Sequence, residues 1–188
     1  MLFKGSKSFP VPIAHGTFNR YLYSLRLQPQ DLTSKRVADC GCGNGVFVID
    51  CLKNNITTFA YGIDDDLMAS KAREAYRNHF VRGTFQDTLP WGQLDYIFFV
   101  SSLFYQEFNK RNFVKMIDKL SKQLKPTGEI RIYPLEYITK NTGDRTLYPL
   151  VIRSLKSRRY NFKLIPIETN FLKNGLRATE LLIIRPKG

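Results

Sequence analysis

The sequence predicts an α/β fold with a doubly wound, mostly parallel sheet. Apolar, β-rich runs alternate with segments of helical spacing along the 188 residues. One run, Leu94–Val100, is apolar almost throughout, which is typical of a central parallel strand covered on both faces. A glycine-rich turn, Gly41–Gly45, joins the first apolar run to a helical segment. A chain of this length is enough for one domain and short for two, so we expect a single domain over residues 1–188.

An N-terminal unit, residues 1–35, precedes the core of this domain. It begins as an extended arm and continues as Thr17–Leu27, whose apolar residues have helical spacing and which Pro29 stops. We interpret this helix as a lid over the core, residues 36–188. In the first half of the core we expect strands at Arg36–Cys40, Thr57–Ile63, Phe80–Phe85 and Leu94–Val100, and helices at Val46–Leu52, capped by Asn44, and at Leu67–Asn78.

The second half of the core continues the alternation and then ends differently. Phe113, Ile117, Leu120 and Leu124 have the i, i+4, i+7, i+11 spacing of a helix, which Pro126-Thr127-Gly128 should end. No helical segment separates the last two apolar runs, so these two strands should be antiparallel. The expected elements are a strand at Glu129–Tyr133, a helix at Leu147–Arg158, and strands at Tyr160–Glu168 and Ala178–Arg185 with a turn at Asn174-Gly175.

The formal net charge is +13, and it is concentrated in the two flanks. Residues 1–36 contribute +5 and residues 140–188 contribute +8, whereas the 12 basic and 12 acidic side chains of residues 37–139 cancel. Basic flanks favour an acidic partner such as a nucleic acid, a phosphorylated metabolite or an anionic membrane surface. A basic surface that only serves solubility explains the same count.

The composition also bears on location and on metals. No apolar run approaches the length of a membrane span, and the N-terminus lacks the layout of a signal peptide. Cys40, Cys42 and Cys51 match neither a disulfide framework nor a zinc site. We therefore expect a cytoplasmic protein without a metal site, while the sequence leaves the oligomeric state open.

Polar residues follow the expected parallel strands at the points where they end, and such ends meet at one edge of a sheet. Asp39 precedes the first glycine of the turn, where its charge would repel a pyrophosphate but would suit a ligand with a cationic end. Asp64 follows the second strand and could accept hydrogen bonds from the two hydroxyls of a ribose. The candidate ligand-binding residues are Asp39, Gly41, Cys42, Gly43, Gly45, Asp64, Asp65, Gln86, Asp87, Val100 and Ser101.

Four segments together resemble the class I, Rossmann-like family of S-adenosylmethionine (SAM)-dependent methyltransferases. They are Val37–Gly43, Tyr61–Asp64, Leu94–Ile97 and Leu124–Glu129, and the resemblance extends over about Arg36–Arg185. It implies a seven-stranded sheet whose last strand is antiparallel, and SAM as the methyl donor. It also implies contacts from the glycine turn and Asp39 to the methionine part, from Asp64 to the ribose, and from Gln86 or Asp87 to the adenine.

The main rival is a dinucleotide-binding oxidoreductase. That class expects G-x-G-x-x-G, which would place glycine where this chain has Val46, and it rarely tolerates an acid in the place of Asp39. A SAM-binding module without turnover is a further alternative that the sequence leaves open. Asp95, at the start of an apolar strand, is interpreted as a structural acid that bonds backbone N–H groups.

The methyl acceptor is less well determined than the donor. Tyr105 and Glu107 follow the fourth core strand and are weak candidates to position or deprotonate a nucleophile, although Glu107 would equally suit a helix start. One hypothesis is an anionic small molecule or another, unidentified acceptor. The other is RNA, bound by the basic arm and by the cluster Lys156–Tyr160.

Overall fold

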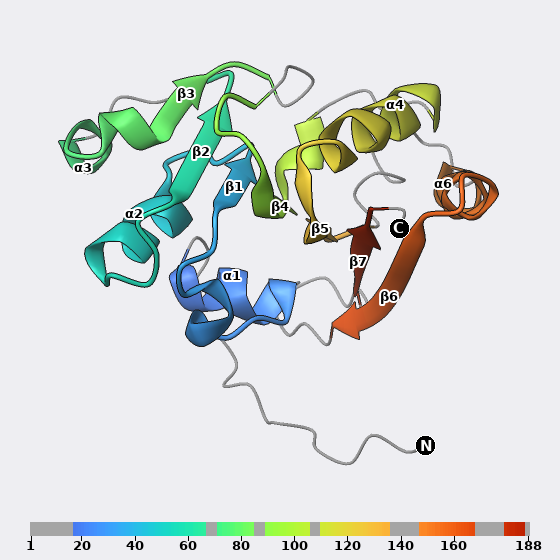
Figure 1. Ribbon diagram of the computed structural model, residues 1–188, viewed down its shortest axis with the longest axis horizontal. Helices are drawn as coiled ribbons and strands as arrows, with labels where there is room; N and C mark the ends of the chain where they lie inside the picture. Colours follow the sequence, from blue (N-terminus) through green and yellow to red (C-terminus); the bar gives the residue numbers. More distant parts are fainter. Residues whose placement is uncertain are drawn as a thin grey trace, which may run out of the picture.

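The computed structural model describes residues 17–66, 71–84, 89–105, 110–135, 147–167 and 179–186. Seven strands form one sheet in the order β3-β2-β1-β4-β5-β7-β6 (Figure 1). The strands are β1 (Val37–Cys40), β2 (Ala60–Asp64), β3 (Phe80–Arg82), β4 (Leu94–Val100), β5 (Leu124–Tyr133), β6 (Asn161–Ile167) and β7 (Thr179–Arg185).

All neighbouring strands from β3 to β5 are parallel, and β7 is antiparallel to both β5 and β6. The predicted doubly wound sheet with an antiparallel last strand is therefore confirmed. The chain order reverses at β1, which pairs with β2 on one side and β4 on the other. Ligands of open α/β sheets bind beyond the carboxyl ends of the strands at such a switch point.

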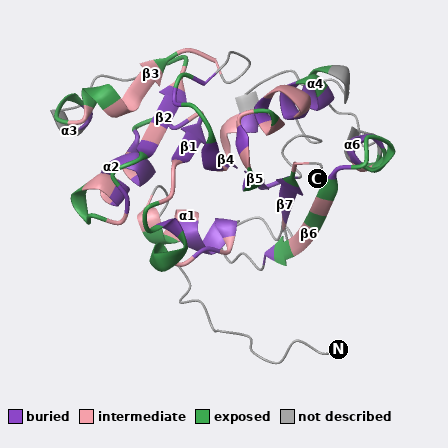
Figure 2. Ribbon diagram, viewed as in Figure 1, coloured by how far each residue is buried: buried purple, intermediate pink, exposed green. Residues whose placement is uncertain are grey.

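Helices cover both faces of the sheet. On one face, α1 (Phe18–Leu25) and α2 (Val46–Lys53) pack on a buried cluster that includes Val37 and Phe98. On the other, α4 (Lys110–Ser121) and α6 (Leu147–Ser157) lie side by side over a cluster that includes Ile97 and Ile130. Figure 2 shows the buried residues concentrated along the central strands and the inner sides of these helices. No helix in the described ranges is long and apolar enough to cross a membrane.

Several element boundaries differ from the sequence-based expectation. Strand β5 begins at Leu124 and continues through Pro126-Thr127-Gly128, which we expected to be a helix stop outside the strand. Gly128 lies so close to β4 that a Cβ there would be 2.8 Å from the Leu94 carbonyl oxygen, and the register shifts at this point. The motif is therefore an irregularity within the strand pair.

The predicted cap of the first core helix is also wrong. Gly45, with φ of +71°, is the N-cap residue of α2, and no side chain caps the helix. The helix expected at Leu67–Asn78 is described only as α3 (Lys71–Glu74), followed by the 3-10 turn Arg77–His79, while residues 67–70 lie outside the described ranges. The turn expected at Asn174-Gly175 also lies outside them.

Helix α1 is fixed at both ends. Its N-terminal half stacks Phe18 and Tyr21 on Phe47 of α2, with ring centroids 5.6 and 5.0 Å apart. At its C-terminal end, the buried Arg131 guanidinium of β5 donates to the carbonyl oxygen of Leu25, where a cation favourably meets the helix dipole. These contacts hold α1 over the face of β1 to which the Asp39 side chain also points.

Candidate functional site

The carboxyl ends of β1, β2 and β4 meet at one edge of the sheet, as the sequence predicted. The structure places Asp39 and the turn Gly41–Gly45 beside Asp64 and close to Ser101 and Ser102. Tyr105 ends the 3-10 turn η3 (Ser102–Tyr105), and its side chain is not described. Three other candidates lie outside the described residues: Gln86, Asp87 and Glu107.

Asp39 is fully buried, and apart from the Tyr21 hydroxyl beside it, its carboxylate has no hydrogen-bond donor among the described residues. Burial raises its pKa to about 7, and the charge of Asp64 adds to the rise. The Tyr21 hydroxyl beside it acts in the opposite direction and moderates that pKa. A buried acid in this state has unused capacity to accept hydrogen bonds, so a cationic ligand would stabilise its ionised form.

The N–H groups of the glycine turn are largely used within the protein. The Gly41 and Cys42 N–H groups donate to the Ile63 carbonyl oxygen at 2.8 and 3.2 Å. The Gly43 N–H donates to Oδ2 of Asp64 at 2.7 Å. The turn therefore has few free N–H donors for a ligand. A ligand would instead contact its backbone surface and the remaining lone pairs of Asp64.

The glycines of this turn serve different purposes. All three have positive φ, at which other residues are strained. A Cβ at Gly41 would lie 2.2 Å from Cβ of Ser102, and one at Gly45 would lie 2.5 Å from the Phe80 ring, so both are needed for packing. A Cβ at Gly43 would meet nothing within 4 Å. Gly43 is therefore where the turn faces open space.

Comparison with protein families identifies the domain. Residues 37–128, which contain this turn and the ends of β1, β2 and β4, match the family model described as a methyltransferase domain. This part of the chain therefore matches a methyltransferase domain. None of the curated proteins compared with the sequence matches it.

Solved structures of methyltransferases share the fold at low identity. The SAM-dependent methyltransferase from Clostridium acetobutylicum has a TM-score of 0.61 at 12% identity, with 85% of this chain and 87% of that one covered. The N-methyltransferase NodS from Bradyrhizobium japonicum has 0.59 at 15%, covering 90% and 97%. The magnesium protoporphyrin IX methyltransferase from Synechocystis, with bound SAH, has 0.54 at 16%, covering 82% and 75%.

The cofactor of such a methyltransferase is SAM, and the described residues fit it. Asp39 supplies a buried acid, without a cationic partner among the described residues, for a ligand that carries an ammonium group. Gly43 leaves the turn open on the side of Asp64, whose two oxygens accept, among the described residues, from the N–H groups of Gly43 and Asp66. Since a carboxylate offers about four lone-pair positions, Asp64 retains capacity for two ribose hydroxyls.

Two residues at the proposed methyltransferase site are missing from the candidate set predicted from the sequence. Tyr21 was assigned only to the apolar face of the lid helix, yet its hydroxyl lies at Asp39 and its pKa is raised well above the usual value, first by burial and then by the Asp39 charge. Ser102, which ends the fourth core strand, was expected near the sulfonium and the incoming substrate but was left out of the candidate set. Its buried Oγ has no partner among the described residues, and it packs against Gly41. Ser101, at φ +59°, directs the chain into this contact.

The cysteines have no chemical role that the geometry supports. Cys40, Cys42 and Cys51 are free and buried, and burial raises the pKa of each thiol. The Cys42 sulfur points to β2, where it lies 2.7 Å from the position of a Cβ at Gly62. The described residues contain no cluster of His, Cys, Asp and Glu that could hold a metal ion.

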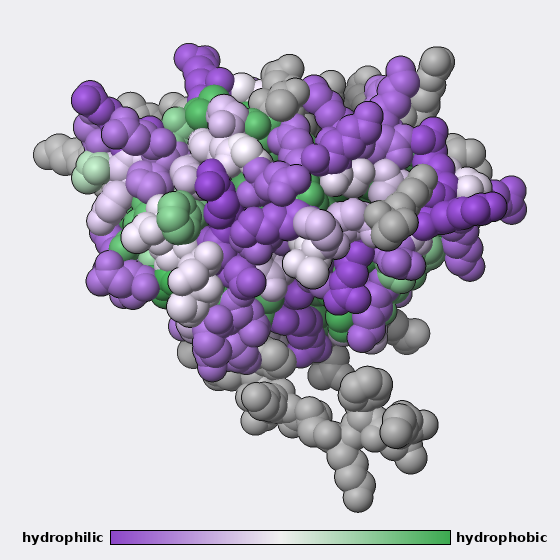
Figure 3. Space-filling view, in the orientation of Figure 1, coloured by the Kyte–Doolittle hydropathy of each residue, from purple (hydrophilic) through white to green (hydrophobic). Residues whose placement is uncertain are grey.

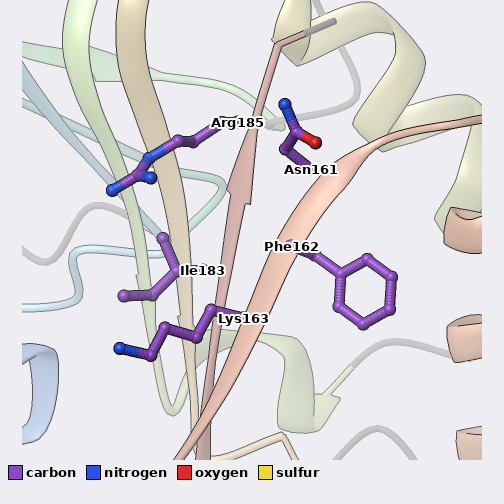
Figure 4. A pocket seen from close by; sticks show the side chains of 5 residues that line it. All are labelled: Asn161, Phe162, Lys163, Ile183 and Arg185. Carbon is purple, nitrogen blue, oxygen red and sulfur yellow. The ribbon is translucent and has the colours of Figure 1, made fainter. Parts of the chain in front are cut away.

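The hollow drawn in Figure 4 lies beside β6 and β7, the last two strands of the sheet. It measures about 270 Å³, and Figure 4 shows Lys163, Ile183 and Arg185 of β6 and β7 on one side and Phe162 directed away from them. The Arg185 guanidinium is paired with Glu129 at 2.6 Å. The hollow lies toward the amino ends of the parallel strands and is therefore separate from the methyltransferase site.

Proposed function

We propose that this protein transfers a methyl group from SAM to a nucleophile that reaches the carboxyl edge of the sheet beside β4 and β5. The observation that carries the proposal is the buried carboxyl group of Asp39, which meets no cation and no donor other than the Tyr21 hydroxyl among the described residues, next to a glycine turn that faces open space at Gly43. A buried polar group without a partner is costly, and such groups persist where a ligand completes them.

In this proposal Asp39 meets the ammonium of the methionine part and Asp64 accepts from the ribose hydroxyls. Asp65, exposed at the end of β2, and Val100-Ser101, at the end of β4, border the cofactor. Gln86 and Asp87 are proposed for the adenine on sequence grounds alone. The Gly41, Cys42 and Gly45 positions contribute backbone surface, since their N–H groups and the Cys42 thiol are directed into the protein.

The cofactor supplies an activated methyl group on a sulfonium, which departs as a neutral thioether when a nucleophile displaces it. The protein then has to orient the reactants and exclude water. α1 closes the site on one side through Tyr21 and Phe18, and Ser102 closes it on another through its contact with Gly41. A base is needed only when the nucleophile carries a proton, and Tyr105 and Glu107 stay the candidates for that role.

Calorimetry with SAM and with its demethylated product tests the donor site. Wild type should bind both, and Asp64→Ala should weaken binding about 100-fold through the loss of two charge-assisted hydrogen bonds. Asp66→Ala is the matched control, because Asp66 is exposed and only its N–H contacts Asp64. A folded wild type that ignores both ligands, or an Asp64→Ala variant that binds like wild type, would overturn the proposal.

The acceptor class is proposed on weaker grounds than the donor. An anionic small molecule fits the basic composition, and transfer of a tritiated methyl group to components of a lysate, fractionated with nuclease and with protease, identifies the class directly. A nucleic-acid acceptor is the second candidate. The specific observation in its favour is the charge on the outer sides of α4 and α6.

A further inference from the structure

The positive charge is distributed unevenly over the two halves of the sheet. Residues 37–107, which hold β1–β4 and the cofactor site, contain nine acidic and five basic side chains. Residues 108–188, which hold β5–β7 with α4 and α6, contain six acidic and 18 basic ones. The zero net charge of residues 37–139 is therefore the sum of an acidic segment, residues 37–107, and the beginning of the basic segment that follows it.

Within the basic half, cations gather on the sides of α4 and α6 that point away from the sheet. Phe113, Ile117 and Leu120 bury the inner side of α4, and Val151 and Leu155 bury that of α6. In Figure 3, hydrophilic side chains predominate over the region of these two helices. The described cations of this basic face are Lys115, Lys119, Lys122, Arg153, Lys156, Arg158 and Arg159.

The one acidic side chain described on these two helices is neutralised from within. The Asp118 carboxylate pairs with the Arg158 guanidinium and accepts a hydrogen bond from the Tyr160 hydroxyl at 2.6 Å. Tyr160 is buried, so this part of the Lys156–Tyr160 cluster joins α4 to the end of α6. Lys156 and Arg159 are exposed beside it.

A hollow in the basic face has the chemistry of a phosphate site. It measures about 280 Å³ and is lined by Asn112, Lys115, Met116 and Lys119 of α4. Its described lining therefore includes two lysines and an asparagine beside the apolar Met116. The volume of the hollow is at the lower limit of the range of about 300–1,000 Å³ for sites that enclose drug-sized ligands, and it is enough for a phosphate and part of a sugar.

Among the described side chains, the basic face exposes no large apolar residue, and this bears on which class of anionic partner it fits. Protein interfaces depend on buried aromatic and aliphatic hot spots, and helices that lie on membranes insert such residues. Of the large apolar side chains that the structure describes, only Phe59 is exposed, and it lies under the Arg36 guanidinium, outside the basic face. A nucleic-acid backbone, in contrast, is bound largely through its charge.

We infer that the basic face binds the phosphate backbone of an RNA. Helix α4 begins near the carboxyl edge of β4, after η3, and its 12 residues extend toward the opposite edge of the sheet. A strand of RNA on this face can therefore reach the proposed methyl-transfer site. This second step, delivery to the site, rests on the proposed function, whereas binding to the face does not.

The test measures binding of a short fluorescein-labelled single-stranded RNA by the full chain without SAM, over a series of salt concentrations. The variant Lys115→Gln/Arg153→Gln/Lys156→Gln removes three cations of the basic face. The matched control, Lys53→Gln/Arg77→Gln/Arg82→Gln, removes three exposed cations elsewhere and gives the same net charge. Circular dichroism checks that both variants are folded.

Wild type should bind with a steep salt dependence. The face variant should bind about 100-fold more weakly at about 0.1 M salt, with its log–log salt slope reduced by about 2, since each phosphate contact contributes about 0.7 to the slope for single strands. The control should lose much less. Equal losses in the two variants, no binding by wild type at low salt, or binding of poly-glutamate or phosphatidylserine vesicles as tight as that of RNA would overturn the inference.

The two proposals fail in different ways. RNA binding that survives while SAM binding is absent contradicts the proposed function and leaves the basic face intact. SAM binding with no RNA binding contradicts only the basic face.

Discussion

Two buried acids on neighbouring strands of this sheet have opposite surroundings. Asp39, near the carboxyl end of β1, has no donor beside it among the described residues other than the Tyr21 hydroxyl, and burial raises its pKa to about 7. Asp95, near the amino end of β4, accepts from the Arg36 N–H at 2.9 Å and pairs with Lys125 at 2.7 Å and with Lys35 at 3.7 Å. Against the cost of burial, these partners hold its pKa below the usual value.

The comparison separates structural acids from functional ones. Asp95 is satisfied by the fold itself, and it links the starts of β1, β4 and β5. This confirms its interpretation as an acid that bonds backbone N–H groups. Burial of Asp39 destabilises the fold, and a bound cationic ligand can offset this destabilisation. Such an arrangement is typical of a binding site. Burial alone does not distinguish the two residues; their partners do.

The largest effect expected from this contrast is on stability. Asp39→Asn should stabilise the cofactor-free protein at pH 8 by up to about 4 kcal/mol, since the wild-type pKa is about 7 in the folded state against an ordinary value of 3.8. It should nevertheless abolish tight SAM binding. Chemical denaturation and calorimetry measure the two effects.

The direction of the Asp39 pKa shift also determines how stability depends on pH. Unfolding ionises Asp39 at any pH between about 4 and 7, so wild-type stability should fall as the pH rises through this window and then level off, a trend absent from Asp39→Asn. SAM affinity should fall about tenfold for each pH unit below about 7, because the ammonium needs the ionised carboxylate. A SAM affinity that stays constant from pH 5 to about 8 would remove Asp39 from the ammonium contact.

Asp95→Asn should have the opposite outcome and a smaller magnitude. We expect a loss of about 2 kcal/mol above pH 5, because the lysine partners are 44% and 37% exposed and solvent weakens the ion pairs. A lowered pKa means that the stabilisation is present above the usual pKa and is lost as the pH falls through the folded value. SAM binding should be unchanged. A variant that remains as stable as wild type yet loses SAM would reverse the assignment of roles.

The sequence alone was sufficient for the parts of the fold where local pattern and tertiary context agree. Leu94–Val100 is apolar except for Asp95 and forms β4 with the predicted bounds. Asp39 and Asp64 could be placed at one edge because parallel strands end together. The glycine turn could be assigned because its positions cannot all be filled by other residues.

Other features depend on contacts between distant segments. Pro126-Thr127-Gly128 has the composition of a turn, but pairing with β4 draws it into β5. Tyr21 belongs to an apolar stripe, and only the packing of α1 on α2 brings its hydroxyl to Asp39. The basic face needs both α4 and α6, which are far apart in sequence but in contact in space.

Tyr21→Phe should change the properties of Asp39 least, and it tests whether the Tyr21 hydroxyl lowers the pKa of Asp39. The Tyr21 hydroxyl lowers the pKa of Asp39, so its removal should raise that pKa further, by less than about one unit, equivalent to less than about 1.4 kcal/mol. The phenylalanine ring preserves the stacking on Phe47, so the fold should be retained. The measurable consequence is that the midpoint of the pH dependence of SAM affinity moves to higher pH. If the midpoint moves to lower pH instead, Tyr21 acts through something other than its hydroxyl beside Asp39, and the acid owes its pKa to burial and Asp64 alone.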